Sequence, residues 1–201
     1  MTYAELQSAI GDWLMRQDLT SVIPTFIELA EEQFNATIRV RRMIATATLT
    51  VTDGEANLPA DWLESRNVRY VDDPYRSLEY VTLEAADDLR GLQPGSTNQF
   101  TIRGDKIEFI VDPEDGTEIE LTYYAAIPAL SDSNTTNWLL TRSPSAYLYG
   151  ALKHSALYLK DDDRVERWAG LHDRALEEIR MEDHKAQWSG STLKIRSRAL
   201  G

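Results

Sequence analysis

The spacing of apolar residues changes twice along the chain, and this change limits the possible fold more than any other feature of the sequence. Apolar residues recur at helical spacing up to about residue 42, at the two-residue spacing of strands from Met43 onward, and at helical spacing again after Pro144. This order predicts an α+β fold, in which the N- and C-terminal helices form a discontinuous helical bundle with an inserted antiparallel β module. We expect the bundle to comprise residues 1–42 and 136–187, the β module residues 43–135, and an extended C-terminal tail residues 188–201.

Two amphipathic helices are expected at the N-terminus. Thr2-Tyr3-Ala4-Glu5 has the form of a capping box, and the helix that it starts runs to about Arg16. Pro24 suits the first turn of a second helix. The spacing predicts inner faces made of Leu6, Ala9, Ile10, Trp13 and Leu14 in the first helix and of Phe26, Leu29, Ala30, Phe34 and Thr37 in the second, with Glu31 among the residues that face mostly away.

The middle of the chain carries strand patterns. From Ala45 to Val51, apolar residues alternate with threonines, which indicates a strand. Asp53-Gly54 follows and indicates a tight turn. Short strands are expected at Val68–Val71 and Ser77–Val81, with a short helix at about Leu83–Leu89. An antiparallel meander with turns at Gly104-Asp105 and Pro113–Gly116 is then predicted by Phe100, Ile102, Ile107, Phe109, Val111, Ile119, Leu121 and Tyr123.

The C-terminal third is helical again. Ser143-Pro144 starts a helix with apolar residues on most sides, which is typical of a helix buried between layers. Asp161–Asp163 breaks this helix and caps the next one, which is expected to end near Lys185. The remainder, Trp188–Gly201, has too few apolar residues to fold alone.

The net charge of −12 is spread unevenly over the 201 residues. From His184 to the end there are four cations and no carboxylate side chain, whereas residues 1–183 hold the other 17 cations and all 33 acids. An acidic body argues against sequence-specific binding of duplex DNA, which needs a basic face on the folded part. Solubility explains the acidity in the plainest way. A more specific explanation is a surface that faces DNA without adhering to it.

No pattern in the sequence indicates catalysis, a cofactor site or a metal site. Cysteine is absent, and His154, His172 and His184 do not lie at a zinc-ligand spacing. The sequence also lacks the motifs of a phosphate-binding loop and of a nucleophile elbow. We expect His172 to be a core histidine with one hydrogen bond. Chance carboxylate pairs among 33 acids give an unspecific signal. The nine tyrosines and five tryptophans could form a platform for single-stranded nucleic acid, but they lie at core spacing in an acidic chain, which favours a core role. Neither a membrane span nor a secretory signal is expected.

Two segments resemble a known family. The first is TLTVTDGEANLPADWLESRNVRYV, from Thr48 to Val71. The second runs from Asn137 to Ile179 and contains the proline-led YLYGAL helix, the Asp-rich break and the Arg164, Trp168, Leu171 spacing. With the N-terminal helix pair, these segments resemble the head–tail adaptor (connector) proteins of tailed bacteriophages, including tail tubular protein A of short-tailed phages. The similarity lies in packing residues, so it carries no catalytic residue over to this chain.

The resemblance implies a structural role at the head–tail junction of a virion, after assembly in the host cytoplasm. It implies a ring of twelve copies beneath the portal protein, joined to a tail tube or nozzle protein and surrounding double-stranded DNA that it does not bind specifically. The C-terminal extension is then expected to dock onto the portal, with Leu193 and Ile195 in apolar grooves and Lys194, Arg196 and Arg198 against an acidic partner. The alternatives are another neck or stopper subunit of a virion and, in a different class, a soluble enzyme or ligand-binding domain.

Overall fold

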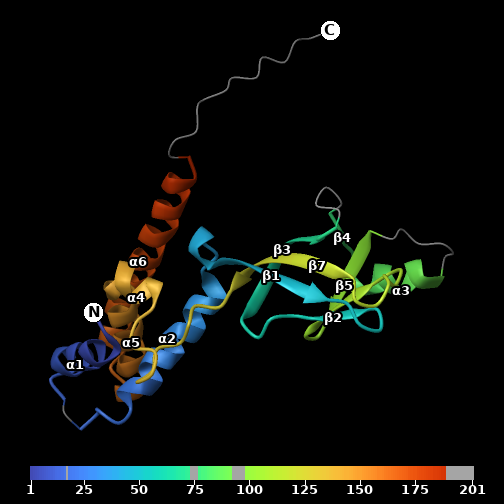
Figure 1. The fold of residues 1–201 in the computed structure, drawn as a ribbon. Helices are drawn as coiled ribbons and strands as arrows, with labels where there is room; N and C mark the ends of the chain where they lie inside the picture. Colours follow the sequence, from blue (N-terminus) through green and yellow to red (C-terminus); the bar gives the residue numbers. More distant parts are fainter. Residues whose placement is uncertain (17, 73–76, 92–97, 189–201) are drawn as a thin grey trace. The chain divides into compact units, whose positions relative to one another are not determined.

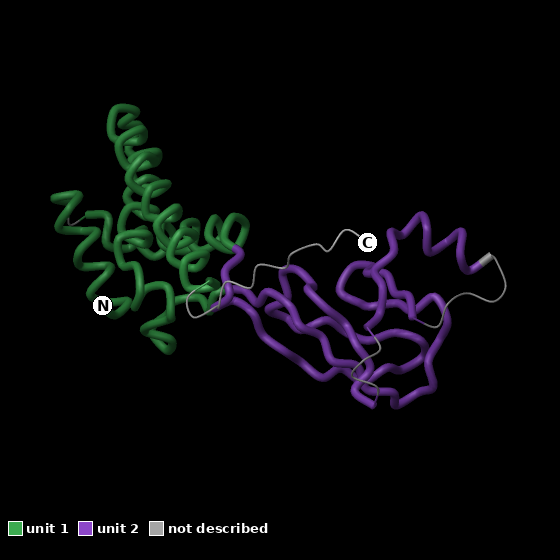
Figure 2. The backbone as a smooth tube through the Cα atoms, turned by 90° about the horizontal axis from the view of Figure 1, so that it is seen from above, with its two compact units in different colours: residues 1–38, 127–201 green, residues 39–126 purple. Residues whose placement is uncertain are grey.

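A computed structural model describes residues 1–16, 18–72, 77–91 and 98–188 (Figure 1). The chain divides into two compact units, shown in different colours in Figure 2. Residues 1–38 and 127–201 make up the first, here called the helical unit, and residues 39–126 make up the second, the β unit. The predicted α+β class is confirmed, with helices from both ends of the chain in one unit and the strands in the other.

The limits of the compact units differ by a few residues from the ranges expected from the sequence. Residues 39–42 belong to the β unit, because the short 3-10 helix η1 (Arg41–Met43) contacts the β sheet. The segment that begins at Ile127 belongs to the helical unit, because two of its backbone amides bind side chains of one helix. The Ile127 N–H donates to the Asn35 side chain at 2.8 Å, and the Leu130 N–H donates to the Glu31 carboxylate at 2.9 Å.

The helical unit contains five helices within the described residues: α1 (Tyr3–Leu14), α2 (Ile23–Thr37), α4 (Trp138–Arg142), α5 (Pro144–Leu159) and α6 (Asp162–Trp188). The capping box is confirmed, since the Thr2 side chain accepts from the Glu5 N–H and the Glu5 side chain accepts from the Thr2 N–H. Pro24 lies in the first turn of α2 as predicted. Helix α6 is longer than expected and continues to Trp188.

Helical spacing alone assigned four side chains of this unit wrongly. Trp13 is 49% exposed, and Leu29 is also exposed, although both were expected on inner faces. Glu31, expected to face away, is only 6% exposed because it binds the segment after Ile127. Leu157, one of the apolar residues expected on the buried sides of α5, lies exposed in its last turn, so the buried residues of this helix are confined to its earlier turns.

The β unit consists of two sheets and one helix. The first sheet has the strand order β1-β7-β3, and the second has the order β2-β6-β5-β4. The bounds are β1 (Ile44–Thr50), β2 (Glu55–Asn57), β3 (Trp62–Tyr70), β4 (Glu79–Tyr80), α3 (Leu83–Gly91), β5 (Gln99–Arg103), β6 (Lys106–Phe109) and β7 (Glu118–Ala125). Both central residues of the predicted turn, Asp53 and Gly54, have positive φ, the geometry of a tight hairpin turn.

The predicted meander is wrong at its last strand. Strands β5 and β6 pair as an antiparallel hairpin, but β7 leaves β6 and pairs with β1 and β3. The reason is β2, which the sequence patterns did not reveal: it occupies the second edge of β6, so β7 cannot pair there. The module is also not purely antiparallel, because β4 runs parallel to β5.

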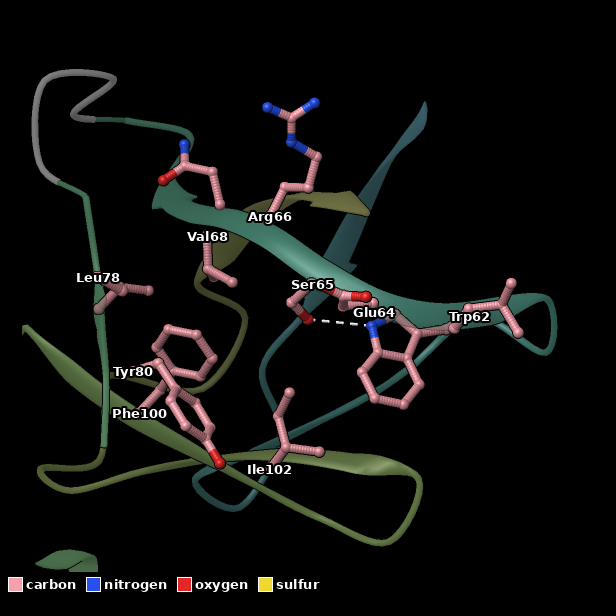
Figure 3. A pocket seen from close by; sticks show the side chains of 11 residues that line it. Trp62, Glu64, Ser65, Arg66, Val68, Leu78, Tyr80, Phe100 and Ile102 are labelled. Atoms are coloured by element: carbon pink, nitrogen blue, oxygen red, sulfur yellow. Dashed lines mark hydrogen bonds between the residues drawn. The ribbon is translucent and has the colours of Figure 1, made fainter. Parts of the chain in front are cut away.

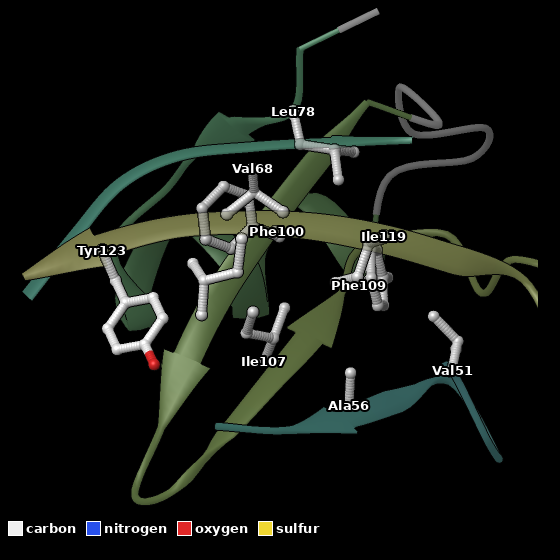
Figure 4. Packing of buried hydrophobic residues seen from close by; sticks show 10 residues of the cluster. Val51, Ala56, Val68, Leu78, Phe100, Ile107, Phe109, Ile119 and Tyr123 are labelled. Atoms are coloured by element: carbon white, nitrogen blue, oxygen red, sulfur yellow. The ribbon is translucent and has the colours of Figure 1, made fainter. Parts of the chain in front are cut away.

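The core of the β unit lies between the inner faces of its two sheets (Figure 4). Ile107 and Phe109 of β6 and Ile119 and Leu121 of β7 are all almost fully buried there. These are the alternating residues that the sequence places on one side of the strands, so the inward pattern is confirmed although the pairing of β7 is not.

Candidate docking surfaces

A buried polar network holds the chain where it returns from the β unit to the helices. The Tyr147 hydroxyl of α5 donates to the Glu31 carboxylate of α2 at 3.0 Å and accepts from the Asn137 side-chain amide at 2.6 Å. Asn137 also caps α4, accepting from the Leu140 N–H, and donates to the Pro128 carbonyl. The network therefore joins α2, α4 and α5 to the returning segment.

The electrostatics of this network suit a structural role. Burial raises the pKa of Glu31, against the opposing effect of the hydrogen bonds from Leu130 and Tyr147. Burial also raises the pKa of Tyr147, so the phenol keeps its proton and acts as a donor. No signal in the sequence distinguished Glu31 from the exposed acids of the same helix. The side chain is recognisable only once its partners are in place.

Removing the hydroxyl in Tyr147→Phe is expected to destabilise the helical unit by about 1–3 kcal/mol, because the buried Glu31 carboxylate loses a donor. The free energy of unfolding from urea titration, followed by helical circular dichroism, measures the effect. Tyr158→Phe is the matched control. Because Tyr158 is 58% exposed, removing its hydroxyl should leave the free energy of unfolding unchanged. Equal stability of the two variants would contradict the prediction.

The three histidines occupy different environments. His172 is 0% exposed and stacks on Phe34 with ring centroids 5.7 Å apart, which confirms a core position. The expected hydrogen bond is absent from the described contacts: Nδ1 lies 3.7 Å from Asp173, too far for one, and Nε2 has no partner either. Burial lowers the pKa of His172 to about 4, and it also lowers the pKa of His154. His184 lies near the exposed end of α6.

The described residues do not include three or more His, Asp or Glu side chains grouped so that they could hold a metal ion. None of the helices in that part of the chain is long and apolar enough to cross a membrane.

Three aromatic rings form a partly exposed cluster on the helical unit. Tyr149 of α5 stacks on Trp168 of α6 with centroids 6.1 Å apart, and Trp13 of α1 meets Trp168 edge-on at 5.6 Å. Large aromatic side chains at the surface are enriched in protein–protein contacts. The sequence spacing predicted these residues as core, and the exposure of Trp13 shows that they cover the core from outside.

The last turns of α6 lie beyond the buried core. Ile179 is the last buried residue of the helix, and two polar contacts to other segments follow it. The Arg180 guanidinium donates to the Thr37 carbonyl at 3.1 Å, and Arg142 pairs with Glu182 at 3.0 Å. Met181 and Trp188 are exposed. The predicted docking residues, Leu193, Lys194, Ile195, Arg196 and Arg198, follow this helix and lie outside the described residues.

A comparison with protein families gives one match: the model of the SU10 adaptor protein family matches residues 1–196. The chain belongs to the SU10 adaptor protein family. The match spans both units, both segments that carried the resemblance and the sequence as far as Arg196. No curated protein matches the chain.

Membership of the SU10 adaptor family confirms the predicted class at the level of a phage adaptor, a structural protein of the virion. An adaptor works through contacts with other virion components, so its functional site is a contact surface. The closer similarity to tail tubular protein A stays a prediction.

Proposed function

We propose that this SU10 adaptor is a head-to-tail adaptor that forms a ring of twelve copies below the portal, joins the portal to a tail tube or nozzle protein, and surrounds the channel through which double-stranded DNA leaves the head. The observation that carries the proposal is the family match over residues 1–196, which includes nearly the whole chain. A closed ring is the usual way for identical subunits to enclose a channel.

The charge of the chain supports a channel role. Residues 1–183 carry a net charge of −16, and the β unit alone carries 17 acids against 9 cations. Acidic side chains repel DNA phosphates, so a ring of such units lets the duplex slide, whereas a basic lining would hold each phosphate that passed. DNA is in this proposal a passing cargo without a specific binding site.

The tail is the proposed portal contact. Leu193 and Ile195 would enter apolar grooves, while Lys194, Arg196 and Arg198 would meet acidic side chains of the portal. The buried residues described in α6 end at Ile179, before the tail begins.

The chain is expected to be monomeric alone and to assemble into a ring on its cognate portal. Mass measurement of the chain, of the portal and of their mixture tests this, and we expect about twelve adaptor copies on each portal ring. A chain that stays an unchanged monomer with saturating portal would overturn the proposed function. A complex of the chain with isolated tail tubes, but not with portal, would assign it to the neck on the tail side instead.

A further inference from the structure

Strand β1 is an open edge of the first sheet of the β unit. The order in that sheet is β1-β7-β3, so β7 pairs with one edge of β1, and no described strand pairs with the other edge from Ile44 to Thr50. After β1, one described bridge joins Thr52 to Glu55, and β2, the strand that begins at Glu55, belongs to the second sheet. The open edge of β1 is therefore as long as the strand itself, seven residues.

Two hydrogen bonds at the end of β1 show which backbone groups face the open edge. The Val51 N–H donates to the Thr117 carbonyl, on the side of β7. The Thr52 N–H donates to the Glu55 carbonyl, on the opposite side. Successive residues of a strand direct their backbone groups to opposite edges. The residues of β1 that direct their N–H and C=O groups to the open edge are therefore its three threonines, Thr46, Thr48 and Thr50.

Strand β1 lacks the features that protect edge strands. Soluble proteins usually prevent pairing at an edge by short length, charged side chains, proline or bulges. The sequence of β1, IATATLT, contains no charged residue and no proline, and its register with β7 is unbroken over all seven pairs. The backbone groups of this edge are therefore ready to pair with another strand.

The other described edge strands of the β unit are protected. Strand β2 has three residues and β4 has two. Strand β3 has exposed charges at Glu64 and Arg66 and two register shifts in its pairing with β7. A cavity of about 490 Å³ opens beside β3, and the Trp62 ring that lines it donates its N–H to the Ser65 hydroxyl of the same strand at 3.0 Å (Figure 3). A long and regular row of free-edge backbone groups is thus found at β1.

The side chains of β1 indicate which strand would fit beside it. Ala45, Ala47 and Leu49 pack against the core of the β unit but are only half-buried. Because alanine is small, the neighbouring strand needs bulky apolar side chains at every second position to complete the cover of the core. Beside the exposed threonines of β1, threonine-like side chains pair well, and β1 offers no charge for a charged residue to meet.

A second copy of the chain does not supply such a strand in the proposed ring. Neighbours in a closed ring are related by rotation about the ring axis, so β1 of one copy meets a different surface of the next copy. The other described strand edges are protected, as set out above. Pairing of two β1 strands would need a twofold axis between neighbours, which would invert every second copy on the portal.

We propose that β1 accepts an extended, uncharged strand of the tail-side protein, which adds to the first sheet through the backbone groups of Thr46, Thr48 and Thr50. The inference deepens the proposed function and rests on it. In that function the portal is bound by Leu193–Arg198, and the tail tube or nozzle protein is the remaining protein partner. The inference names the surface that joins the adaptor to it.

Residue-resolved hydrogen exchange of the full-length chain, with and without isolated tails of the cognate phage, tests the inference. The chain is offered to the tails both free and assembled on portal rings. Tails should slow exchange of the Thr46, Thr48 and Thr50 amides at least about tenfold. The amides between them, at Ala45, Ala47 and Leu49, face β7 and serve as the internal control, because they should exchange slowly with or without tails.

Each outcome of the exchange experiment has one meaning. Tail binding that leaves the three threonine amides unchanged would overturn the inference alone. Slow exchange of these amides in the free chain would also overturn it: if the protection depends on chain concentration, the occupant is a second copy, and if it does not, the occupant is a segment of the same chain. Absence of tail binding in both forms of the adaptor would overturn the tail-joining part of the proposed function and the inference with it.

A matched pair of variants at one position tests the edge itself. Thr48→Pro removes an N–H that faces the open edge and no hydrogen bond to β7, so the fold should persist, as circular dichroism can check. The affinity for tails should fall at least about tenfold, while portal docking stays unchanged. Thr48→Val keeps the N–H and the β-branched side chain and should bind tails like the wild type. Equal binding by two folded variants would contradict the inference, and if Thr48→Pro does not fold, the exchange pattern of the wild type decides.

Discussion

A chain that ends at Thr192 is expected to keep both units folded and to lose portal docking. All the described elements precede the cut, and Ile179, the last buried residue in the described part of the chain, lies well before it. The deletion removes Leu193 and Ile195, whose burial in a partner groove would contribute about 1.5–3 kcal/mol each, so affinity for the portal should fall by at least about a hundredfold. Circular dichroism measures the folding, and co-sedimentation with portal rings measures docking.

Charge reversal separates the electrostatic part of the same contact. Changing Lys194, Arg196 and Arg198 together to Glu should weaken docking strongly, because like charges then meet across the interface. The matched control is the reversal of Arg167, Arg174 and Lys185, three exposed cations of α6, which changes the net charge by the same amount. Raising the salt concentration should weaken wild-type docking only in part, since the apolar contacts are not screened.

The outcome that contradicts this prediction is specific. Truncated chains that still join heads to tails at the wild-type yield would show that the tail is not the anchor. Docking would then have to be assigned to a surface of the folded units, and the partly exposed cluster of Trp13, Tyr149 and Trp168 is the first surface to mutate.

Local signals in the sequence predicted what depends on a few neighbouring residues. The capping box at Thr2, the proline at the start of α2 and the Asp53-Gly54 turn act within one turn of backbone, and all three are confirmed. The alternation around Ile119 likewise identified the inward face of β7, because side-chain alternation is a property of the strand itself.

Features set by partners distant in sequence were not predictable in the same way. The pairing of β7 with β1 and β3 depends on the three-residue strand β2, which is too short to show a period. Glu31 is buried because Leu130 and Tyr147, about a hundred residues away, supply its hydrogen bonds.

The proposed docking residues, by contrast, could be selected from the sequence alone. The tail was singled out by charge and by the lack of a core, properties that need no tertiary contact to be recognised. The family match reaches Arg196 and so includes most of the proposed contact, but it does not say what these residues bind. The deletion and the charge-reversal experiments supply that information.

Acidification is expected to destabilise the helical unit through His172. Burial holds the pKa of this side chain at about 4 in the folded state, with the nearby Lys153 acting in the same direction and Asp173 opposing it, against about 6.5 in an unfolded chain. Above pH 6.5 the imidazole is neutral in both states, so its full contribution is present. As the pH falls from 6.5 to 4, the unfolded chain takes up a proton that the folded chain does not, and about 3 kcal/mol of stability is lost.

The variant His172→Phe isolates this effect, because phenylalanine keeps a ring beside Phe34 but does not titrate. The His172 ring packs closely, with ring atoms 3.2 Å from the position that a Cβ would take at Gly150. A phenylalanine ring at this site can therefore change the absolute stability. The quantity to compare is the slope of the unfolding free energy against pH. Glu31, with its raised pKa, stabilises the fold on acidification and works against His172, but it is present in both proteins and cancels in the comparison. Urea titrations from pH 7 to 4 should therefore show a much smaller slope in His172→Phe than in the wild type. Identical slopes in the two proteins would mean that the folded unit admits the proton at His172 without cost. Its complete burial, with no hydrogen-bond partner among the described residues, argues against that.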